Sequence, residues 1–450
     1  MNILHYCLGF PPYRTGGLTK YAIDLATKQS EDNEVYVMWP GRYGLTPKVR
    51  FVQKKKGDRL HSVEVINPMP VPLLEGIQDA SIYMKDVDGR VYEDFLQEHK
   101  IEVVHAHTLM GLHKELLTAA KRLGIRVIFT VHDFFGICPK VNFMNGSTLC
   151  DESSVLSCEN CYSCCKTALS MNKIKILQSG AYRLAKESKL VKKLKGAYKS
   201  NQAAADFELN TEDKRERVPE KRGMYLNLRE YFFGIFELVD VFHFNSYLTH
   251  QVFRRYYDKE FVYEIVPVIT GSIKDQRAIT EKKDKVHFTF IGNQTPYKGF
   301  PMLIEALDSL VNKGIHNFVL HAYSPQHYFK RDYLICHEPY KANEFPEVMG
   351  NTDLLLMPSR CNETFGLVAL EALSYGRPVL VTQSCGIKDF VDERIAIIIS
   401  GEEQALAVEL EKCCRNPELL AEMNREVLDW ETPFFDFTNH TRLMEAMYKE

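Results

Sequence analysis

The feature that most restricts the fold of this chain is a regular alternation of short apolar segments with helical ones. Apolar segments that we interpret as buried strands lie at 2–10, 34–39, 102–106 and 126–131. Between them, apolar residues recur every three or four positions, which is the spacing of one helix face. Buried strands that alternate with helices are typical of a parallel sheet covered on both faces. The sequence therefore predicts an α/β fold.

The same alternation resumes after a polar, lysine-containing stretch at 269–285. A chain of 450 residues is expected to form two domains of roughly 150–250 residues each. We therefore place a domain boundary in this stretch and predict one domain at 1–270, a second at 271–428 and a terminal helix at 429–450.

The charge and the apolar segments exclude two broad classes of protein. The formal net charge is -3, which argues against a nucleic-acid binder driven by bulk charge. No apolar run approaches the roughly 20 residues that span a bilayer. The chain begins directly with an expected strand rather than a signal peptide, so we expect a cytoplasmic protein.

A short segment around residues 354–375 carries the clearest chemical signal. An apolar strand is followed by a polar turn with Glu363 and Gly366, and a helix is expected from near Phe365. A helix start offers free N–H groups and a positive dipole end, so it can bind a phosphate. Glu371 lies one turn further along, and its side chain leans back toward the helix start. Two carboxylates around a phosphate site indicate a nucleotide-sugar.

In its full context, the segment Pro358-Ser-Arg-Cys-Asn-Glu-Thr-Phe-Gly-Leu-Val-Ala-Leu-Glu-Ala-Leu-Ser-Tyr-Gly-Arg-Pro-Val379 resembles the E-x7-E signature of glycosyltransferase family 4. The resemblance covers nearly the whole chain. It implies a GT-B fold, in which two Rossmann-like α/β domains face a central cleft. It also implies that the first domain binds the acceptor, that the second binds a nucleotide-sugar, and that the last helix crosses back to the first domain.

The resemblance assigns roles in donor binding to the residues of this segment. It implies that Glu363 and the backbone of 364–366 hold the hydroxyls of the donor sugar, and that Glu371 accepts hydrogen bonds from the ribose. The substrate-binding residues expected here are Arg360, Thr364, Phe365, Gly366, Leu367, Val368 and Glu371. Among them, Leu367 and Val368 offer N–H groups to the diphosphate.

A second motif, Gly292-Asn-Gln-Thr-Pro-Tyr-Lys-Gly299, follows the first strand of the second domain. In the family a lysine at the position of Lys298 places positive charge on the leaving diphosphate, which is a strong effect in a dry site. Asn293 stands where the family usually has arginine, and an amide cannot neutralise charge. Either Arg14 or Arg360 compensates, or donor activation is weaker than usual.

Two further features of the first domain match the family. Gly16 and Gly17 resemble its N-terminal glycine loop, which closes over the donor phosphate and the acceptor. His132, at the end of a strand, stands where the family often has a histidine that contacts the donor sugar. His105 and His107 end another strand, and for them a structural role is equally compatible with the sequence.

Six of the twelve cysteines fall between 138 and 165, and a subset of the family has a similar HD…CP…C…CxxC insertion. Clustered thiols in a reducing compartment favour a metal over disulfides. Four thiolates suit tetrahedral zinc, and the expected ligands are Cys138, Cys150, Cys158 and Cys161, with Cys164 as a substitute for one of them. Such a zinc is expected to be structural, and the alternatives are a metal-free loop and an iron–sulfur cluster.

The resemblance predicts a retaining transferase that needs no cofactor for catalysis. It moves a sugar from a nucleoside diphosphate donor, of UDP or GDP type, to a hydroxyl of a glycan or lipid-linked acceptor in surface polysaccharide or glycoconjugate assembly. The basic segment at 171–200 is compatible with peripheral contact at the inner membrane face and equally with a solvated helix. The rival interpretations are a catalytically impaired binding subunit and a phosphorylase-like enzyme on the same fold.

Overall fold

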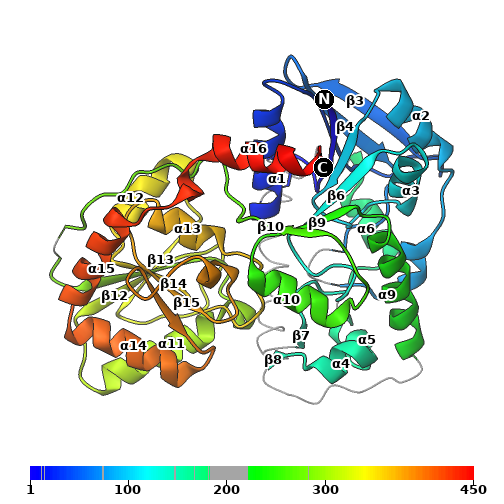
Figure 1. Cartoon of the computed structure of the whole chain (residues 1–450). Coiled ribbons are helices and arrows are strands. Elements are labelled where there is room, and N and C mark those ends of the chain that lie inside the picture. Colours follow the sequence, from blue (N-terminus) through cyan, green and yellow to red (C-terminus); the bar gives the residue numbers. More distant parts are fainter. Residues whose placement is uncertain are drawn as a thin grey trace. The chain divides into compact units, whose positions relative to one another are not determined.

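The computed structural model describes residues 1–11, 13–14, 16–72, 76–145, 148–166, 168–180, 182, 221–281 and 283–449. The chain divides into two compact units (Figure 1). The first contains Met1–Asn245, Gln251–Val266 and the residues from His440, and the second contains Ser246–His250 and Pro267–Asn439. Of the basic segment 171–200, most lies outside the described residues, so the expectation of membrane contact stays a prediction.

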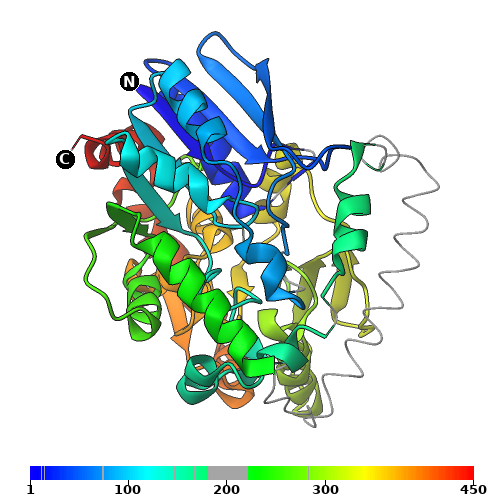
Figure 2. The same ribbon diagram turned by 90° about the vertical axis from the view of Figure 1, so that its right-hand side faces the viewer.

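The first unit is built on an eight-stranded sheet with the order β10-β9-β6-β5-β1-β2-β4-β3. Every neighbouring pair is parallel except the edge hairpin of β3 and β4, drawn in blue in Figure 2. The strands are β1 (Asn2–Tyr6), β2 (Glu34–Pro40), β3 (Arg50–Lys55), β4 (Leu60–Ile66), β5 (Val103–Ala106), β6 (Arg126–Val131), β9 (Val241–Phe244) and β10 (Tyr263–Ile265).

Helices flank this sheet and form the connections between its parallel strands. They are α1 (Gly17–Gln29), α2 (Arg90–Glu98), α3 (Lys114–Arg122) and α9 (Arg222–Phe236). Two more helices, α10 (Tyr247–Tyr256) and α16 (Phe437–Met447), contribute residues to both units. In its described residues, the segment with the six cysteines (residues 138–165), called the cysteine segment below, holds only short elements. These are β7 (Met144–Asn145), β8 (Thr148–Leu149), α4 (Glu152–Ser157) and α5 (Cys161–Cys164), and α6 (Met171–Leu177) follows the segment.

The second unit is built on a six-stranded, fully parallel sheet with the order β13-β12-β11-β14-β15-β16. Its strands are β11 (Val286–Ile291), β12 (Phe318–Tyr323), β13 (Leu334–His337), β14 (Leu354–Met357), β15 (Val379–Thr382) and β16 (Ala396–Ile399). Its helices are α11 (Phe300–Asn312), α12 (Phe345–Gly350), α13 (Leu367–Leu373), α14 (Glu403–Arg415) and α15 (Glu418–Asp429).

The central strands are mostly apolar because helices cover both faces of each sheet. Leu354, Leu355 and Leu356 of β14 are at most 1% exposed, although successive side chains point to opposite faces. Phe288 of β11 and Leu380 of β15 are fully buried on either side of β14. The predicted α/β class, with two mainly parallel sheets, is confirmed.

Each sheet contains one point at which the order of its strands reverses direction. In the second unit the chain runs from β11 outward to β13 and then returns to place β14 on the other side of β11. In the first unit β1 and β5 have the same relationship. Ligands of open α/β sheets bind outside the carboxyl ends of the strands at such a switch point. The loops after β11 and β14, and those after β1 and β5, are therefore the first places to look for a site.

Candidate functional site

Lys298 and Glu363 meet at the switch point of the second unit. Lys298 ends a short 3-10 turn (Pro296–Lys298) after β11, and Glu363 lies in the loop after β14. Their side chains form an ion pair and are 30% and 18% exposed, respectively. The same carboxylate oxygen of Glu363 accepts hydrogen bonds from Ser359 Oγ (3.2 Å) and Cys361 Sγ (3.7 Å). The sequence pointed to the lysine and the glutamate, but not to the two side chains that support the glutamate.

The two loops that carry this pair are fastened to each other by their backbones. Arg360 N donates to Tyr297 O at 2.9 Å. Gly299 has a φ of 74°, and a Cβ atom added there would lie 1.9 Å from the carbonyl oxygen of Pro358. Only glycine fits this close approach. These contacts between the two loop backbones thus set the position of Lys298 relative to Glu363.

The pair is held in its charged form on both sides. Burial lowers the pKa of Lys298, but the attraction of Glu363 outweighs this effect and raises the pKa above its ordinary value. Burial likewise raises the pKa of Glu363, while Lys298 and the hydrogen bonds from Ser359 and Cys361 outweigh it and lower the pKa. An ammonium group therefore stands at the carboxyl ends of β11 and β14 at neutral pH.

Gly366 sets the start of α13 two residues after Phe365, near which the sequence led us to expect it. Its φ of 108° lies outside the helical region, so the helix begins at Leu367. A Cβ at Gly366 would lie 2.8 Å from Cys385 Sγ and 3.0 Å from Met357 Cε. The glycine is therefore required by its conformation and by packing inside the unit, independently of any ligand.

The backbone around Gly366 has oxygens that are already in use and N–H groups that are available. Thr364 O accepts hydrogen bonds from the hydroxyls of Ser246 and Thr249, each at 2.7 Å. Phe365 O accepts from Ile387 N at 2.6 Å, and the ring of Phe365 is 2% exposed. Within the described part of the chain, the first backbone bonds of α13 come from Ala369 and Leu370. The N–H groups of Leu367 and Val368 thus remain for a ligand.

The other residues expected to bind the donor lie in the same unit. Glu371 is half-buried on α13, and its charge, after burial, helps to raise the pKa of Tyr340. Arg360 follows Ser359 in the loop after β14, and Asn293 follows the end of β11, where its carbonyl accepts from Thr295 N at 2.8 Å. Of the two arginines considered as substitutes at position 293, Arg360 lies in the unit that holds Asn293, and Arg14 belongs to the other unit.

In the first unit, Gly16 and His132 lie in the loops after β1 and β6, and Gly17 is the first residue of α1. Gly16 has a φ of 115° and caps α1, whose first backbone bond runs from Lys20 N to Gly16 O at 3.0 Å. Both glycines are exposed. His132 follows β6, and burial lowers its pKa to about 3, so the ring is neutral.

His132 is the end of a chain of hydrogen bonds that runs through the interior of the first unit. His107 and His105, for which the sequence left a structural role open, both belong to this chain and are at most 1% exposed. Its members are Val266, His243, Thr130, His105, Tyr448, Gln29, His5, His107 and His132. Tyr448 and Gln29 carried no signal in the sequence, because their contacts join positions more than 300 residues apart.

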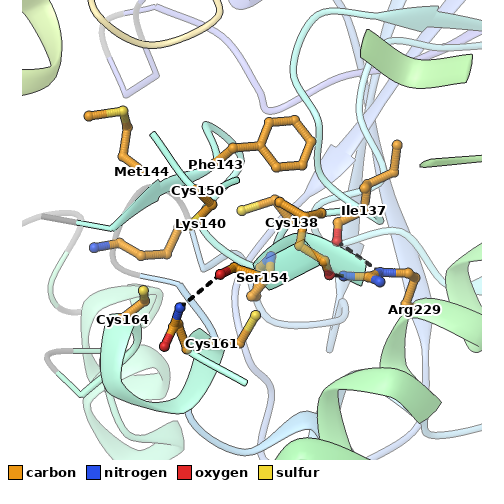
Figure 3. Close-up of a pocket in the computed structure, with 13 residues that line it drawn as sticks. Ile137, Cys138, Lys140, Phe143, Met144, Cys150, Ser154, Cys161, Cys164 and Arg229 are labelled. Carbon is orange, nitrogen blue, oxygen red and sulfur yellow. Dashed lines mark hydrogen bonds between the residues drawn. The ribbon is translucent and has the colours of Figure 1, made fainter. Parts of the chain in front are cut away.

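The expected zinc ligands lie together in the cysteine segment of the first unit. Cys138, Cys150 and Cys161 line one pocket, shown in Figure 3, and Cys164 lines it as well. Cys158 instead accepts a hydrogen bond from Arg229 Nη2 at 2.9 Å.

Two family models match the chain, one in each unit. The model described as Glycosyltransferase Family 4 matches residues 15–147, and the model described as Glycosyl transferases group 1 matches residues 272–429. The chain belongs to glycosyltransferase family 4. The second match contains both Lys298 and Glu363, and the first contains His132.

Curated relatives resemble this family 4 chain over limited regions. An alpha-1,3/1,6-mannosyltransferase from Yarrowia lipolytica is 29% identical over 120 residues, which are 26% of this chain and 26% of the relative. A D-inositol 3-phosphate glycosyltransferase from Arthrobacter sp. is 30% identical over 157 residues, 31% of this chain and 37% of the relative. The matches thus span well under half of the relatives' length.

Solved structures share the fold of this family 4 chain along its whole length. Sucrose-phosphate synthase from Thermosynechococcus elongatus matches with a TM-score of 0.59 and 13% identity, covering 100% of this chain and 98% of that one. WaaG, a glycosyltransferase of lipopolysaccharide biosynthesis, matches with a TM-score of 0.56 and 17% identity, covering 98% and 99%. HepE from Anabaena in complex with UDP matches at 0.57 and 12%, covering 99% of each chain. The predicted GT-B fold is confirmed.

The helices of the described residues include none that is both long and apolar enough to cross a membrane.

Proposed function

We propose that this protein is a retaining glycosyltransferase that moves a sugar from a nucleoside diphosphate donor, of UDP or GDP type, to a hydroxyl of a glycan or lipid-linked acceptor. The second unit binds the donor and the first binds the acceptor. This activity fits the assembly of a surface polysaccharide or glycoconjugate. Membership of family 4 supports the reaction class, and the HepE complex with UDP supports a nucleotide on this fold.

The observation that carries the proposal is the charged Lys298–Glu363 pair at the switch point between β11 and β14. A diphosphate leaving group gains negative charge as its bond to the sugar breaks. The ammonium of Lys298 and the N–H groups of Leu367 and Val368 stabilise that charge from fixed positions. Because the lysine supplies positive charge to the diphosphate, we propose that catalysis requires no metal cofactor.

The proposed reaction retains the configuration of the anomeric carbon. The bond between this carbon and the diphosphate oxygen breaks, and the acceptor oxygen bonds to the same face of the sugar. The acceptor proton passes to the departing phosphate oxygen, so no protein base is consumed. Glu363 holds sugar hydroxyls and Glu371 holds the ribose, while His132 contacts the donor sugar.

The test is a thermal-shift panel of UDP, GDP, ADP, CMP and dTDP, each alone and as common sugar conjugates. A ligand at 100 times its dissociation constant stabilises the folded state by about 2.7 kcal/mol. We expect one nucleotide to raise the melting temperature of the wild type and to raise that of Lys298→Ala less. Lys313→Ala is the matched control, because Lys313 forms an ion pair with Glu411 at the far end of α11 in the same unit.

Donor turnover separates this proposal from its rivals. With the stabilising nucleotide-sugar we expect slow release of the nucleotide, and Lys298→Ala should reduce this release about 100-fold or more. Nucleotide binding without any turnover would favour a catalytically impaired binding subunit, an outcome that Asn293 makes worth testing. Turnover only with inorganic phosphate or a sugar phosphate would favour a phosphorylase-like enzyme. Either result would overturn the proposal.

A further inference from the structure

The pocket in Figure 3 brings together four thiols that are scattered along the sequence from 138 to 164. They are those of Cys138, Cys150, Cys161 and Cys164. Cys150 and Cys164 are close enough to share a hydrogen bond. Cys138 carries its thiol into the same pocket from the turn after Phe134. Thiols that converge in this way are suited to a thiophilic metal ion.

The thiol of Cys138 lies against the turn that follows it in the sequence. The backbone N–H groups of Lys140 and Phe143 lie close enough to its sulfur to interact with it. Metal ligands are commonly oriented by neighbouring groups of this kind. The backbone that supplies one of these groups is unusual, because Val141 and Phe143 have φ values of 66° and 56°. A β-branched residue in this region is strained, and strain of this kind collects where a structure holds a ligand.

Cys158 differs from these four thiols because it does not line the pocket, although its thiol also interacts with that of Cys161. Its sulfur accepts a hydrogen bond from the Arg229 guanidinium, which also donates to the carbonyls of Val155, Leu156 and Ile137. Arg229 thus holds Cys158 beside the pocket and at the same time connects the cysteine segment to α9. Because Cys164 lines the pocket and Cys158 does not, the lining favours exchanging the two in the ligand set that the sequence led us to expect.

The segment has little regular structure of its own. Its elements are short, since α4 has six residues, α5 has four, and β7 and β8 have two each. Segments with so little secondary structure are commonly held by a metal or by disulfides.

We propose that Cys138, Cys150, Cys161 and Cys164 bind one structural zinc ion, with Cys158 held next to it by Arg229. Four zinc-bound sulfurs lie roughly 3.8 Å apart, since each Zn–S bond is about 2.3 Å. Among the described residues, no three of these sulfurs are mutually within 4.8 Å. Binding therefore draws the pocket inward around the ion. With four protein ligands the ion has no open position, so it acts on stability rather than on the reaction.

The test is the metal content of the full chain, purified under reducing conditions and measured by mass spectrometry. We expect about one zinc per chain, and we expect Cys138→Ser, Cys150→Ser, Cys161→Ser and Cys164→Ser each to lose it. Cys165→Ser and Cys158→Ser are matched controls from the same segment and should keep it. Metal-free protein with reduced thiols, a disulfide in this segment, or iron with visible absorption would overturn the proposal. Loss of zinc in Cys158→Ser with retention in Cys164→Ser would overturn the ligand set.

A measurement on the wild type covers the case in which the serine variants do not fold. Cobalt(II) exchanged into the protein should give the intense near-ultraviolet absorption of several thiolate ligands and the visible bands of tetrahedral geometry. A weak, octahedral cobalt spectrum would contradict the four-thiolate site.

A second inference comes from the chain of hydrogen bonds that ends at His132. The direction in which these bonds donate is fixed at the other end of the chain, at Val266. Val266 O can only accept, so His243 Nε2 must carry the proton of their 2.7 Å bond. Burial lowers the pKa of His243 to about 4, so the ring is neutral and its Nδ1 is an acceptor. Thr130 therefore donates to His243 and accepts from His105 Nε2.

The donor and the acceptor of each further hydrogen bond in the chain follow in the same way. The pKa of His105 is lowered mainly by burial, so its Nδ1 accepts the 2.7 Å bond from the Tyr448 hydroxyl. The Tyr448 oxygen accepts from Gln29 Nε2, which turns Gln29 Oε1 toward His5 Nε2. His5 is neutral as well, because burial lowers its pKa to about 4.

The last two bonds reach His132. His5 Nδ1 accepts from His107 Nε2 at 2.9 Å, and His107 Nδ1 then accepts from His132 Nε2 at 3.4 Å. We infer that this chain holds His132 as the Nε2–H tautomer, with Nδ1 unprotonated. Tyr448 is then a positioning residue for His132.

Nitrogen-15 NMR of the histidine rings tests the tautomer in the wild type without reference to activity. We expect the nitrogen-15 chemical shifts of His132 to show Nε2 protonated and Nδ1 unprotonated at pH 7. Tyr448→Phe removes the donor to His105 and should yield a mixture of tautomers at His132. Tyr92→Phe is the matched control, because it breaks another buried tyrosine–histidine bond, to His113 at 2.6 Å, outside the chain. A protonated Nδ1 in the wild type, or an unchanged His132 in Tyr448→Phe, would overturn the inference.

Discussion

Glu363 keeps its charge although its side chain is only 18% exposed, and it does so because Lys298, Ser359 and Cys361 all turn toward it. A buried charge without such partners would be costly. Each of these three residues lies in one of the two loops that meet where Gly299 approaches Pro358. At the scale of single residues, the chemistry of the site thus depends on backbone contacts that take no part in the reaction.

The charge of Glu363 leads to a prediction about pH. Its folded pKa lies below the ordinary value of 4.5, so its contribution to stability is present above that value and is lost as the pH falls below it. Lys298, whose folded pKa is raised, contributes fully at every pH below 10.5. We expect urea unfolding to show Glu363→Gln less stable than the wild type at pH 7 and the difference to shrink toward pH 3. A difference that grows on acidification would contradict the ion pair.

Gly299 offers a second prediction at this scale. Gly299→Ala places a methyl group 1.9 Å from Pro358 O and also occupies a left-handed conformation, so we expect a loss of about 2–4 kcal/mol in denaturant unfolding. Gly314→Ala is the control, because Gly314 has a φ of 80° but nothing within 4 Å of the added carbon. It should cost about 1–2 kcal/mol, the conformational part alone. Equal losses in the two variants would show that the close approach is absent.

At the scale of elements, the sequence predicted the strands well and the helix starts less well. Strands such as β14 and β15 are buried on both faces, so they form largely apolar runs that are visible without a structure. The start of α13 was placed near Phe365, whereas the conformation of Gly366 delays it to Leu367. A glycine's φ depends on the tertiary contacts that demand it, here with Cys385 and Met357, and these are not local in sequence.

The residues of the candidate site also differ in how far the sequence predicted them. Lys298 and Glu363 were predictable because each belongs to a motif within a few residues of a strand end. The chain from Gln29 through Tyr448 to His132 was not predictable, because these contacts join residues far apart in sequence. Ser359 and Cys361 lie within four residues of Glu363, but no motif showed that their side chains turn toward it. The cysteine ligands lie between these cases: the cluster was visible, but the contact of Cys158 with Arg229 was not.

Glu363 lies in the loop after β14 and Glu371 lies on α13. We expect replacement of these two carboxylates to have different effects on binding and turnover. On the proposed function, Glu371→Ala removes hydrogen bonds to the ribose and should weaken nucleotide binding about 10- to 100-fold. Glu363→Ala should reduce turnover more than it reduces nucleotide affinity, because it acts at the sugar. Calorimetry with the nucleotide alone and turnover assays with the full donor separate the two effects. If both variants behave as the wild type does, the donor site is elsewhere.

At the scale of the whole molecule, the first unit is completed by residues from the far end of the chain. Met444 is fully buried and Tyr448 is 4% exposed, and both belong with the strands near the N-terminus. Hydrogen bonds from Tyr448 to His105 and from Asn33 to Glu445 join these segments. The stability of the first unit therefore depends on α16.

This dependence predicts unequal effects at two neighbouring positions of α16. Met444→Ala should destabilise the first unit by about 2–5 kcal/mol, because it leaves a cavity in a closed core. Leu443→Ala is the control, since that side chain is 46% exposed, and it should change stability by less than about 0.5 kcal/mol. Hydrogen exchange read at β1 and β5 would locate the effect. Faster exchange confined to the second unit in Met444→Ala would contradict it.

The contact between Gly299 and the Pro358 carbonyl has a consequence for large surveys of variants. Such surveys rank positions by how poorly they tolerate replacement, and intolerance is often taken as a sign of function. Gly299 should rank beside Lys298, although it has no side chain to offer a substrate. A tolerance map of this protein would therefore outline the scaffold that holds the reacting groups together with the groups themselves, and only assays that separate folding from turnover would distinguish them.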